Sequence, residues 1–506
     1  MLILSLFLTP AYAAEEAEKP KTEWSASGAW SIWNLQQQNF LLGKDHALDD
    51  ASYTVQNLRV TAEATRGRVG VSTRFDAAQG WWGADNDPAN GYTASADADG
   101  NVSSTRVWND DALFRNKETN YALHVDIAYG WVNFGPVKIQ GGRQYFGVGN
   151  KLVLDEDYEG VQGIAPLGDK ARLELGWAKV SEGQDAYRLP AGSLMSDGGD
   201  GTYAQYNDVD LFSLRGFYKQ QKVLELEGFA LLWWDRIGEG GDADRSYSQV
   251  PNGLTYNRPR FEPNLGTVGA FGVMAKGALE KGLSYNAEAD FLIGTDPVDN
   301  ADHAGGMLDI NNGQVMGYNA YAELTQGFST AKPMDVGLLL GYGSGDPDPT
   351  SGRGNINRLD TMGFFPFLNV WEDSVMPDVE GISPQGLGSP VSRGYREFEN
   401  TTAAALKFGI KPHKSLRLEV VGAYLRASQP VYAFDATGTP DLSASSKNLG
   451  WEADANAIVN LFNGGFQGKV LFGYFSPGDA AGYLINGNID TLEPALEVKT
   501  EAIIKF

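Results

Sequence analysis

The sequence predicts a transmembrane antiparallel β-barrel of about 18 strands, on three observations. No stretch of the 506 residues approaches the roughly 20 consecutive apolar residues that a membrane helix needs. Many segments of about 10 residues instead alternate apolar and polar side chains, which is typical of strands with one face to lipid and one to a lumen. The connections between these segments alternate between short and long, like the periplasmic turns and extracellular loops of a bacterial barrel.

The first 14 residues, MLILSLFLTPAYAA, are expected to be a secretory signal peptide. They have an apolar core, and Ala11, Tyr12 and Ala13 give the small-x-small form of a cleavage site. No Lys or Arg precedes the core, which a start site placed too late would explain. Residues 15–22 then form a short periplasmic segment, and residues 23–506 form one barrel domain.

The C-terminal segment alternates without a break. Leu496, Val498 and Phe506 fall on one face, and Glu497 and Lys499 fall on the other. Segments 451–461 and 283–293 repeat the pattern. We expect the strand that ends in Phe506 to be recognised by the barrel-assembly machinery of a Gram-negative outer membrane.

The same alternation, followed along the chain, gives the remaining strands. Short connections such as 66–67 and 463–465 carry turn residues, and long ones such as 78–118 and 344–399 are rich in Gly, Asp, Asn and Pro. The predicted strands are 23–34, 53–65, 68–77, 119–132, 137–147, 158–165, 170–181, 208–219, 223–235, 267–279, 283–294, 314–327, 334–343, 400–411, 415–427, 448–461, 467–475 and 495–506.

Net charge and the lack of cysteine restrict the partners and the metal sites that the chain can have. The net charge is −24, which disfavours nucleic acid as a partner, and the chain has no cysteine for disulfides or thiolate metal sites. An acidic exterior could meet lipopolysaccharide through bridging divalent cations, or could be an ordinary solvated surface. Outer-membrane lipid, lipopolysaccharide and small polar solutes are the expected partners.

Alternation also assigns a set of side chains to the lumen. Their charges are mixed and slightly acidic, which suits small polar or zwitterionic molecules or cations, although many of these groups could instead pair with one another. The predicted pore-lining residues are Arg59, Glu63, Arg74, Asp126, Lys138, Arg143, Gln144, Glu225, Glu227, Glu288, Asp290, Glu323, Arg417, Glu419, Glu452, Asp454, Glu497, Lys499 and Glu501. Glu174, Arg172, Lys407, Lys469 and Lys505 have the same parity.

A barrel of this width leaves an open channel unless loops fold into it. The long segment 345–399 is the candidate constriction, and its alternative role is an exterior contact with a receptor or lipopolysaccharide. Its candidate eyelet residues are Arg353, Arg358, Asp360, Arg393 and Arg396.

Two motifs resemble the alginate-export-type porins. Residues 137–147 read VKIQGGRQYFG, and residues 338–367 read LLLGYGSGDPDPTSGRGNINRLDTMGFFPF. The resemblance implies an eighteen-stranded monomeric barrel. Strict parity would send Arg143 toward lipid, so we expect a β-bulge at Gly141 and Gly142 to turn it into the lumen. There it would either bind an anionic group of the solute or form a structural salt bridge to a neighbouring strand. A polyuronate would need a lumen dominated by Arg and Lys, from which the mixed charges depart.

No catalytic constellation is found, so the chain is not expected to be an enzyme. The histidines are His46, His124, His303 and His413, and only His124 has inward parity, where a hydrogen-bonded lumen histidine is the favoured interpretation. No cofactor is expected beyond a loop Ca²⁺. Solvated turns are the favoured alternative for the candidate Ca²⁺ ligands, which are Asp97, Asp99, Asp346 and Asp348.

The sequence therefore favours an outer-membrane porin for passive or facilitated diffusion of small polar or charged solutes. The alternatives are a polysaccharide-export channel of the alginate-export type and a structural or adhesive barrel plugged by its loops.

Overall fold

The fold is taken from a computed structural model. The residues that it describes are 20–40, 42–43, 50–81, 95–96, 102–103, 123–182, 208–235, 267–294, 315–345, 368–371, 374–376, 379–380, 398, 400–434 and 440–506.

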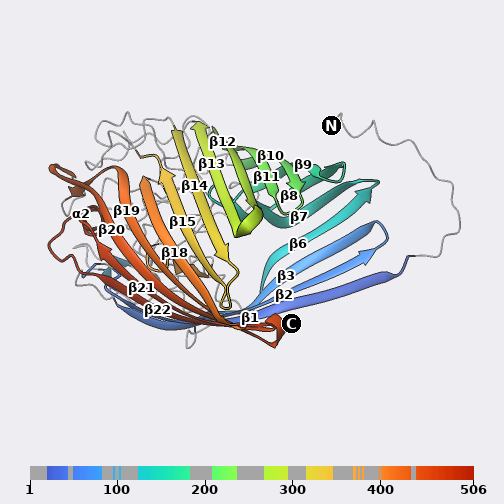
Figure 1. Ribbon diagram of the computed structural model, residues 1–506. Coiled ribbons are helices and arrows are strands. Elements are labelled where there is room, and N and C mark those ends of the chain that lie inside the picture. The colour runs from blue at the N-terminus through green and yellow to red at the C-terminus, as the bar shows by residue number, and fades with distance from the viewer. Residues whose placement is uncertain are drawn as a thin grey trace.

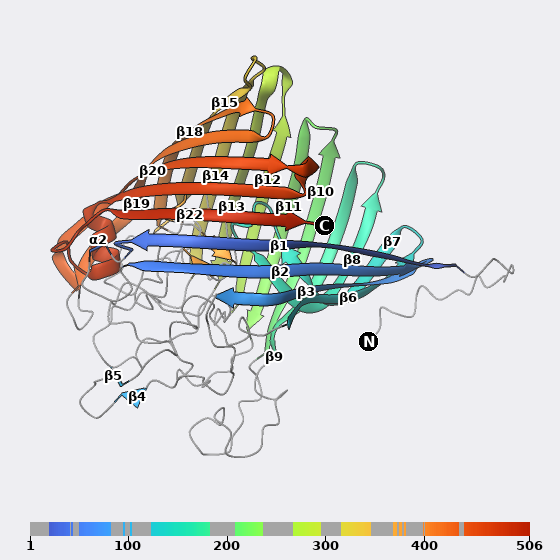
Figure 2. The same cartoon turned by 90° about the horizontal axis from the view of Figure 1, so that it is seen from below.

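The chain forms a closed antiparallel barrel of 18 strands, as predicted (Figure 1). Each strand pairs with its neighbours in the chain, and β1 closes the barrel against β22 from Ala29↔Lys505 to Gln38↔Leu496 (Figure 2). The strands are β1 (Thr22–Gln38), β2 (Ala51–Arg66), β3 (Val69–Trp81), β6 (Leu123–Phe134), β7 (Val137–Gly147), β8 (Asp155–Leu167), β9 (Ala171–Glu182), β10 (Asp208–Gln220), β11 (Leu224–Asp235), β12 (Thr267–Ala278), β13 (Leu283–Gly294), β14 (Val315–Phe328), β15 (Met334–Gly343), β18 (Thr401–His413), β19 (Leu416–Phe434), β20 (Pro440–Leu461), β21 (Phe466–Pro477) and β22 (Ala495–Lys505).

Most strand ends lie within a few residues of their predicted positions, and β19 and β20 are the exceptions. These two strands run on as a paired ribbon, with Val431↔Ser446 and Phe434↔Pro440, after register shifts that interrupt the alternation. The Ser-rich and Pro-containing sequence there favours a loop, so pairing was not predicted. Helix α2 (Asp479–Asn486) was also not predicted, and it buries Leu484 and Ile485 near the loop end of the barrel.

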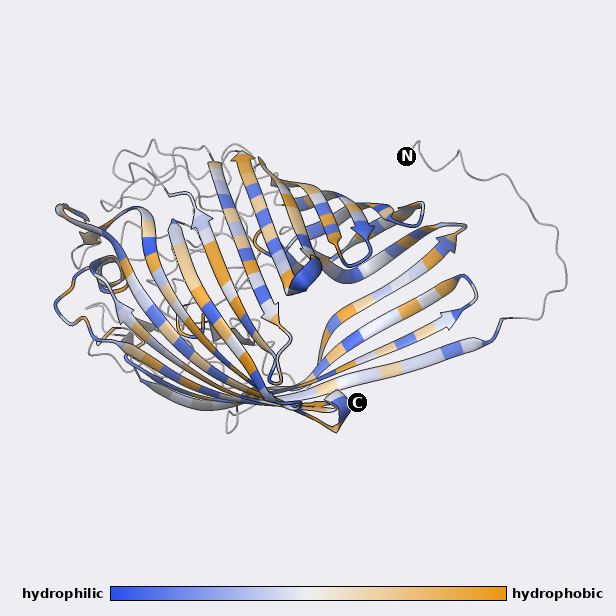
Figure 3. Cartoon of the chain, in the orientation of Figure 1, coloured by the Kyte–Doolittle hydropathy of each residue, from blue (hydrophilic) through white to orange (hydrophobic). Residues whose placement is uncertain are grey.

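The barrel has two different surfaces, as Figure 3 shows by the alternation of hydrophobic and hydrophilic bands along each strand. Outward positions carry exposed apolar side chains, such as Leu406 at 64%, Leu175 at 57% and Val71 at 52%. Inward positions toward the short turns are mostly charged. Among the described residues, no helix is both long and apolar enough to cross a membrane.

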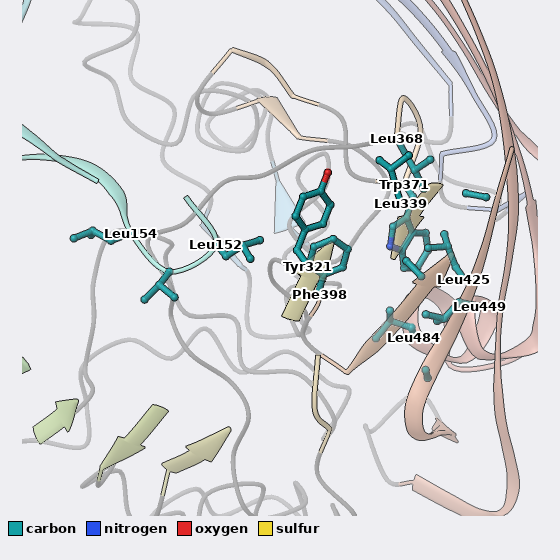
Figure 4. Packing of buried hydrophobic residues seen from close by; sticks show 14 of the residues in the cluster. Leu152, Leu154, Tyr321, Leu339, Leu368, Trp371, Phe398, Leu425, Leu449 and Leu484 are labelled. Atoms are coloured by element: carbon teal, nitrogen blue, oxygen red, sulfur yellow. The ribbon is translucent and has the colours of Figure 1, made fainter. Parts of the chain in front are cut away.

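The inward wall changes character along the barrel axis. Toward the end of the long connections it is apolar, and Leu35, Trp233, Leu292, Leu425 and Phe475 are each at most 1% exposed. Trp233, Leu292, Leu425 and Phe475 belong to one buried cluster that also includes residues from the connections themselves. In Figure 4, Tyr321 of the wall lies beside Phe398, and their rings stack with centroids 6.1 Å apart.

Candidate functional site

The candidate site is the lumen, and the strand registers place most of the predicted pore-lining side chains there. They alternate with the exposed apolar positions of their strands. The inward set is Arg59, Glu63, Arg74, Lys138, Gln144, Arg172, Glu174, Glu225, Glu227, Glu288, Asp290, Glu323, Lys407, Arg417, Glu419, Glu452, Asp454, Lys469, Glu497, Lys499, Glu501 and Lys505.

Charges in the turn-side half pair with one another around the wall. Lys407 Nζ lies 2.6 Å from Glu323 Oε1, and Lys469 Nζ lies 2.5 Å from Glu501 Oε2. Arg417 joins Glu419 at 2.8 Å and also binds Asp335 at 2.6 Å. The turn-side wall therefore presents paired charges more than isolated ones.

Arg215 of β10 is an inward residue that the sequence analysis missed. It lies 2.8 Å from Glu227 and 3.2 Å from Glu174, so one guanidinium serves carboxylates of both adjacent strands. Two cations also stack on the Phe217 ring. The guanidinium carbons of Arg172 and Arg215 lie 3.7 Å and 4.7 Å from its centroid. Phe217 also points inward, so the inward face of β10 does not look polar in the sequence. Phe212 and Leu214 are apolar and point outward, and their alternation with Arg215 is the signal that would have placed Arg215 inward.

The connection between β7 and β8, residues 148–154, crosses the lumen. The Asn150 backbone N–H donates to the carboxylate of Glu288, and Asn150 Nδ2 donates to Asn286 Oδ1 at 3.0 Å. Both acceptors belong to β13, and four strands of the barrel separate β13 from β8. Leu152 and Val153 in this segment are fully buried. We call residues 148–154 the crossing segment.

The strands β7 and β8, which the crossing segment connects, separate from the barrel wall before the crossing segment begins. Pairing between β6 and β7 ends at Ala128↔Arg143, although both strands continue beyond that pair. Arg74 on the inward face of β3 lies 2.9 Å from Asp157 of β8, yet Asp157 has the parity of Val161, whose side chain is exposed. Arg74 points into the barrel and Asp157 has the parity of the outward face of β8. The two can meet because the ends of β7 and β8 next to residues 148–154 lie inside the barrel.

This seam between β6 and β7 is closed by charged groups. Arg74 also binds Asp126, which sits at a register shift of β6, and Arg59 lies 3.2 Å from Asp126 and 2.5 Å from Asp76. Asp126 thus reaches the lumen through a bulge. The network ties the inserted strands to the near wall, while Glu288 ties the crossing segment to the far wall.

The predicted bulge at Gly141 and Gly142 is wrong, and so is the inward placement of Arg143 that depended on it. The registers of β7 with β6 and β8 run through both glycines without a shift. Gly142 instead takes a φ of 127°, and a β-carbon there would overlap the Ala128 carbonyl oxygen. Arg143 stays at outward parity and is satisfied at the seam, where it donates to the Asp126 carbonyl and to Glu159, each at 3.0 Å.

A second segment enters the lumen from the long connection 344–399. The backbone N–H groups of Val370 and Trp371 donate to the Glu452 carboxylate at 2.6 and 2.9 Å. Asn369 Nδ2 donates to Asn456 Oδ1 at 2.8 Å, and Trp371 packs on Phe475 with ring centroids 5.1 Å apart. We call residues 368–371 the docked segment.

Other predicted residues lie outside the described part of the chain. These are Arg353, Arg358, Asp360, Arg393 and Arg396 of the candidate constriction, and Asp97, Asp99, Asp346 and Asp348 of the candidate Ca²⁺ turns. His124 pairs with Asp76 in the register of β6 and β3. Within the described ranges, no three His, Cys, Asp or Glu side chains converge to hold a metal ion.

Comparison with known proteins finds no matching family model and no matching curated protein. Among solved structures, OccK8 (OprE) of Pseudomonas aeruginosa is similar, with a TM-score of 0.48 at 11% identity, covering 96% of this chain and 98% of that chain. OccAB3 of Acinetobacter baumannii gives a TM-score of 0.49 at 10% identity over 95% of this chain and 99% of that chain. OpdK of P. aeruginosa, solved with vanillate, gives 0.46 at 10% identity over 95% and 98%.

Proposed function

We propose that this chain is an outer-membrane channel of a Gram-negative bacterium, through which small polar or charged solutes diffuse without energy input. The observation that supports this proposal is the pairing of two surfaces on one closed barrel. The outward face is an apolar belt suited to hydrocarbon, and the inward turn-side wall carries the charged side chains.

The crossing segment and the docked segment set the path of the solute. Each enters the lumen and is held by a wall carboxylate, Glu288 for the first and Glu452 for the second. They narrow the loop end, and beyond them the solute meets paired charges of both signs. Because the charges are fixed by neighbours, they select by orienting dipoles and by pore width, and no chemical step is required.

The proposal includes the partners that such a barrel needs. Outer-membrane lipid and lipopolysaccharide would surround the apolar belt. The assembly machinery would engage the strand that leads to Phe506. The backbone of Phe506 exchanges two hydrogen bonds with that of Gly28, at 2.9 and 3.0 Å.

A polyuronate of the alginate type is less well supported as the solute than small polar molecules. Inward cations such as Arg215, Lys407 and Arg417 are each engaged by wall carboxylates, so they offer little free charge to a polyanion. A plugged, adhesive barrel is the second candidate, because the loop end of the lumen is filled by a buried apolar cluster.

Planar-bilayer recording of the purified protein tests the proposal. A channel gives discrete conductance steps that scale with salt and a reversal potential near zero in a salt gradient, as expected for a mixed-charge wall. Absence of any step at all voltages would refute the channel and favour the plugged barrel.

A further inference from the structure

We propose that Glu288 and Asp290 of β13 hold a divalent cation, Ca²⁺ in the first place, at the point where the crossing segment meets the far wall. The two residues lie two apart on one strand, and so their side chains share the inward face. Each is 3% exposed.

The carboxylate oxygens at this point lack partners. Glu288 Oε2 accepts the Asn150 backbone N–H. Glu288 Oε1 and both oxygens of Asp290 accept no hydrogen bond from any other residue in the described part of the chain, and the two carboxyl groups lie within hydrogen-bonding reach of each other. Glu227 nearby offers no positive charge, and its own partner is Arg215 at 2.8 Å.

Two buried carboxylates with three unsatisfied oxygens are costly unless a positive group reaches them. One shared proton would leave one negative charge uncompensated. A divalent cation offsets both charges and takes oxygen ligands of this kind.

The surroundings leave room for the carboxylates and supply more oxygen. Gly149 of the crossing segment and Gly272 of β12 lie where a β-carbon would overlap Glu288 and Asp290, respectively. Asn319 of β14 is opposite Asp290 in the register and brings an amide oxygen to the same level. Loop backbone, wall carboxylates and amide groups thus meet at one place, and the cation would pin the crossing segment across the lumen.

The test counts bound Ca²⁺ on the purified full chain in detergent, first stripped with EDTA and then titrated with Ca²⁺ alone. We expect the wild type to bind one more Ca²⁺ per chain than Asp290→Asn or Glu288→Gln, with a dissociation constant on the order of 10⁻⁴–10⁻³ M. Glu323→Gln removes an inward carboxylate on the next strand and should keep the wild-type count. Heat-modifiable gel mobility identifies folded barrels, and Glu288→Gln serves if Asp290→Asn does not fold.

Equal Ca²⁺ counts for the wild type and both folded variants would overturn the proposal and indicate a shared proton instead. The count does not depend on conduction, so it can fail or succeed separately from the channel proposal. If both hold, EDTA should raise the current noise of the wild type and leave that of Asp290→Asn unchanged.

Discussion

Removing the Glu452 carboxylate should release the docked segment from the wall. In Glu452→Ala, the N–H groups of Val370 and Trp371 lose acceptors at 2.6 and 2.9 Å in a buried place. A buried N–H group left without an acceptor costs about 1–3 kcal/mol, so the two together amount to about 2–6 kcal/mol. At about 1.4 kcal/mol per tenfold, the docked fraction falls by a factor of about 30–10⁴ relative to the undocked one.

Packing of the docked segment opposes its release, so we expect the loss of the docked fraction to lie toward the lower end of that range. Trp371 is 1% exposed and lies against Phe475, and Val370 is fully buried over Gly473. These contacts persist in the variant, so we expect intermittent undocking: a higher mean conductance with added flicker, and a gain of about 10²-fold in segment accessibility.

Thiol labelling measures that accessibility directly. The chain has no cysteine, so Leu368→Cys, at a position 3% exposed, provides the only thiol. Its reaction rate with a charged maleimide should rise about 10²-fold when Glu452→Ala is added. Glu452→Gln retains one acceptor oxygen and should give a smaller rise.

Glu419→Gln is the matched control, because it removes an inward charge that binds Arg417 and has no contact with the docked segment among the described residues. It should alter ion selectivity without altering the labelling rate. Unchanged labelling in Glu452→Ala, or an equal rise in Glu419→Gln, would refute the anchoring role of Glu452.

Three further predictions concern the seam and the lipid face. Arg74→Gln leaves Asp126 and Asp157 without their shared partner and should lower the free energy of unfolding by about 3 kcal/mol in chemical denaturation, with partial recovery when Asp157→Asn is added. Gly142→Ala should cost about 1–3 kcal/mol in the same assay because the backbone of Gly142 has a φ of 127°. Gly141→Ala should be tolerated, because a β-carbon there meets nothing closer than 3.7 Å, and equal effects of the two substitutions would contradict the strain expected at Gly142. Leu406→Arg should cost about 2–4 kcal/mol in lipid vesicles and Leu461→Arg near the turn end about 0–1 kcal/mol, and a reversed order would place the membrane at another height.

The barrel was predictable from the sequence because strand alternation is a local signal. Segments such as 283–294 carry period-two patterning that fixes both the strand and its inward face, and β13 has the predicted bounds. Local patterning fails where it is interrupted, as in the ribbon of β19 and β20 beyond Ala427.

The long connection 345–399 was expected to narrow the lumen, and the docked segment belongs to it. The anchor of the docked segment on Glu452, and the crossing segment as a whole, were not predictable in the same way, because they depend on contacts between distant parts of the chain. Glu288 and Glu452 have the pattern of free lumen charges, and only the fold reveals that each accepts backbone N–H groups from an inserted segment. Arg143 shows the same limit. Parity placed it correctly, and the expected bulge misplaced it, since its partners lie at a seam that no local signal marks.

The two inserted segments share one mode of attachment, since each is held through main-chain N–H groups on a wall carboxylate. An amide N–H is present at every residue except proline, so the docking positions 150, 370 and 371 can change side chain without losing their bond to Glu288 or Glu452. The two wall carboxylates therefore fix the paths of the inserted segments without dictating which residues those segments contain. Substitutions in the segments are limited by packing alone, and the wall residues that hold the segments can stay unaltered.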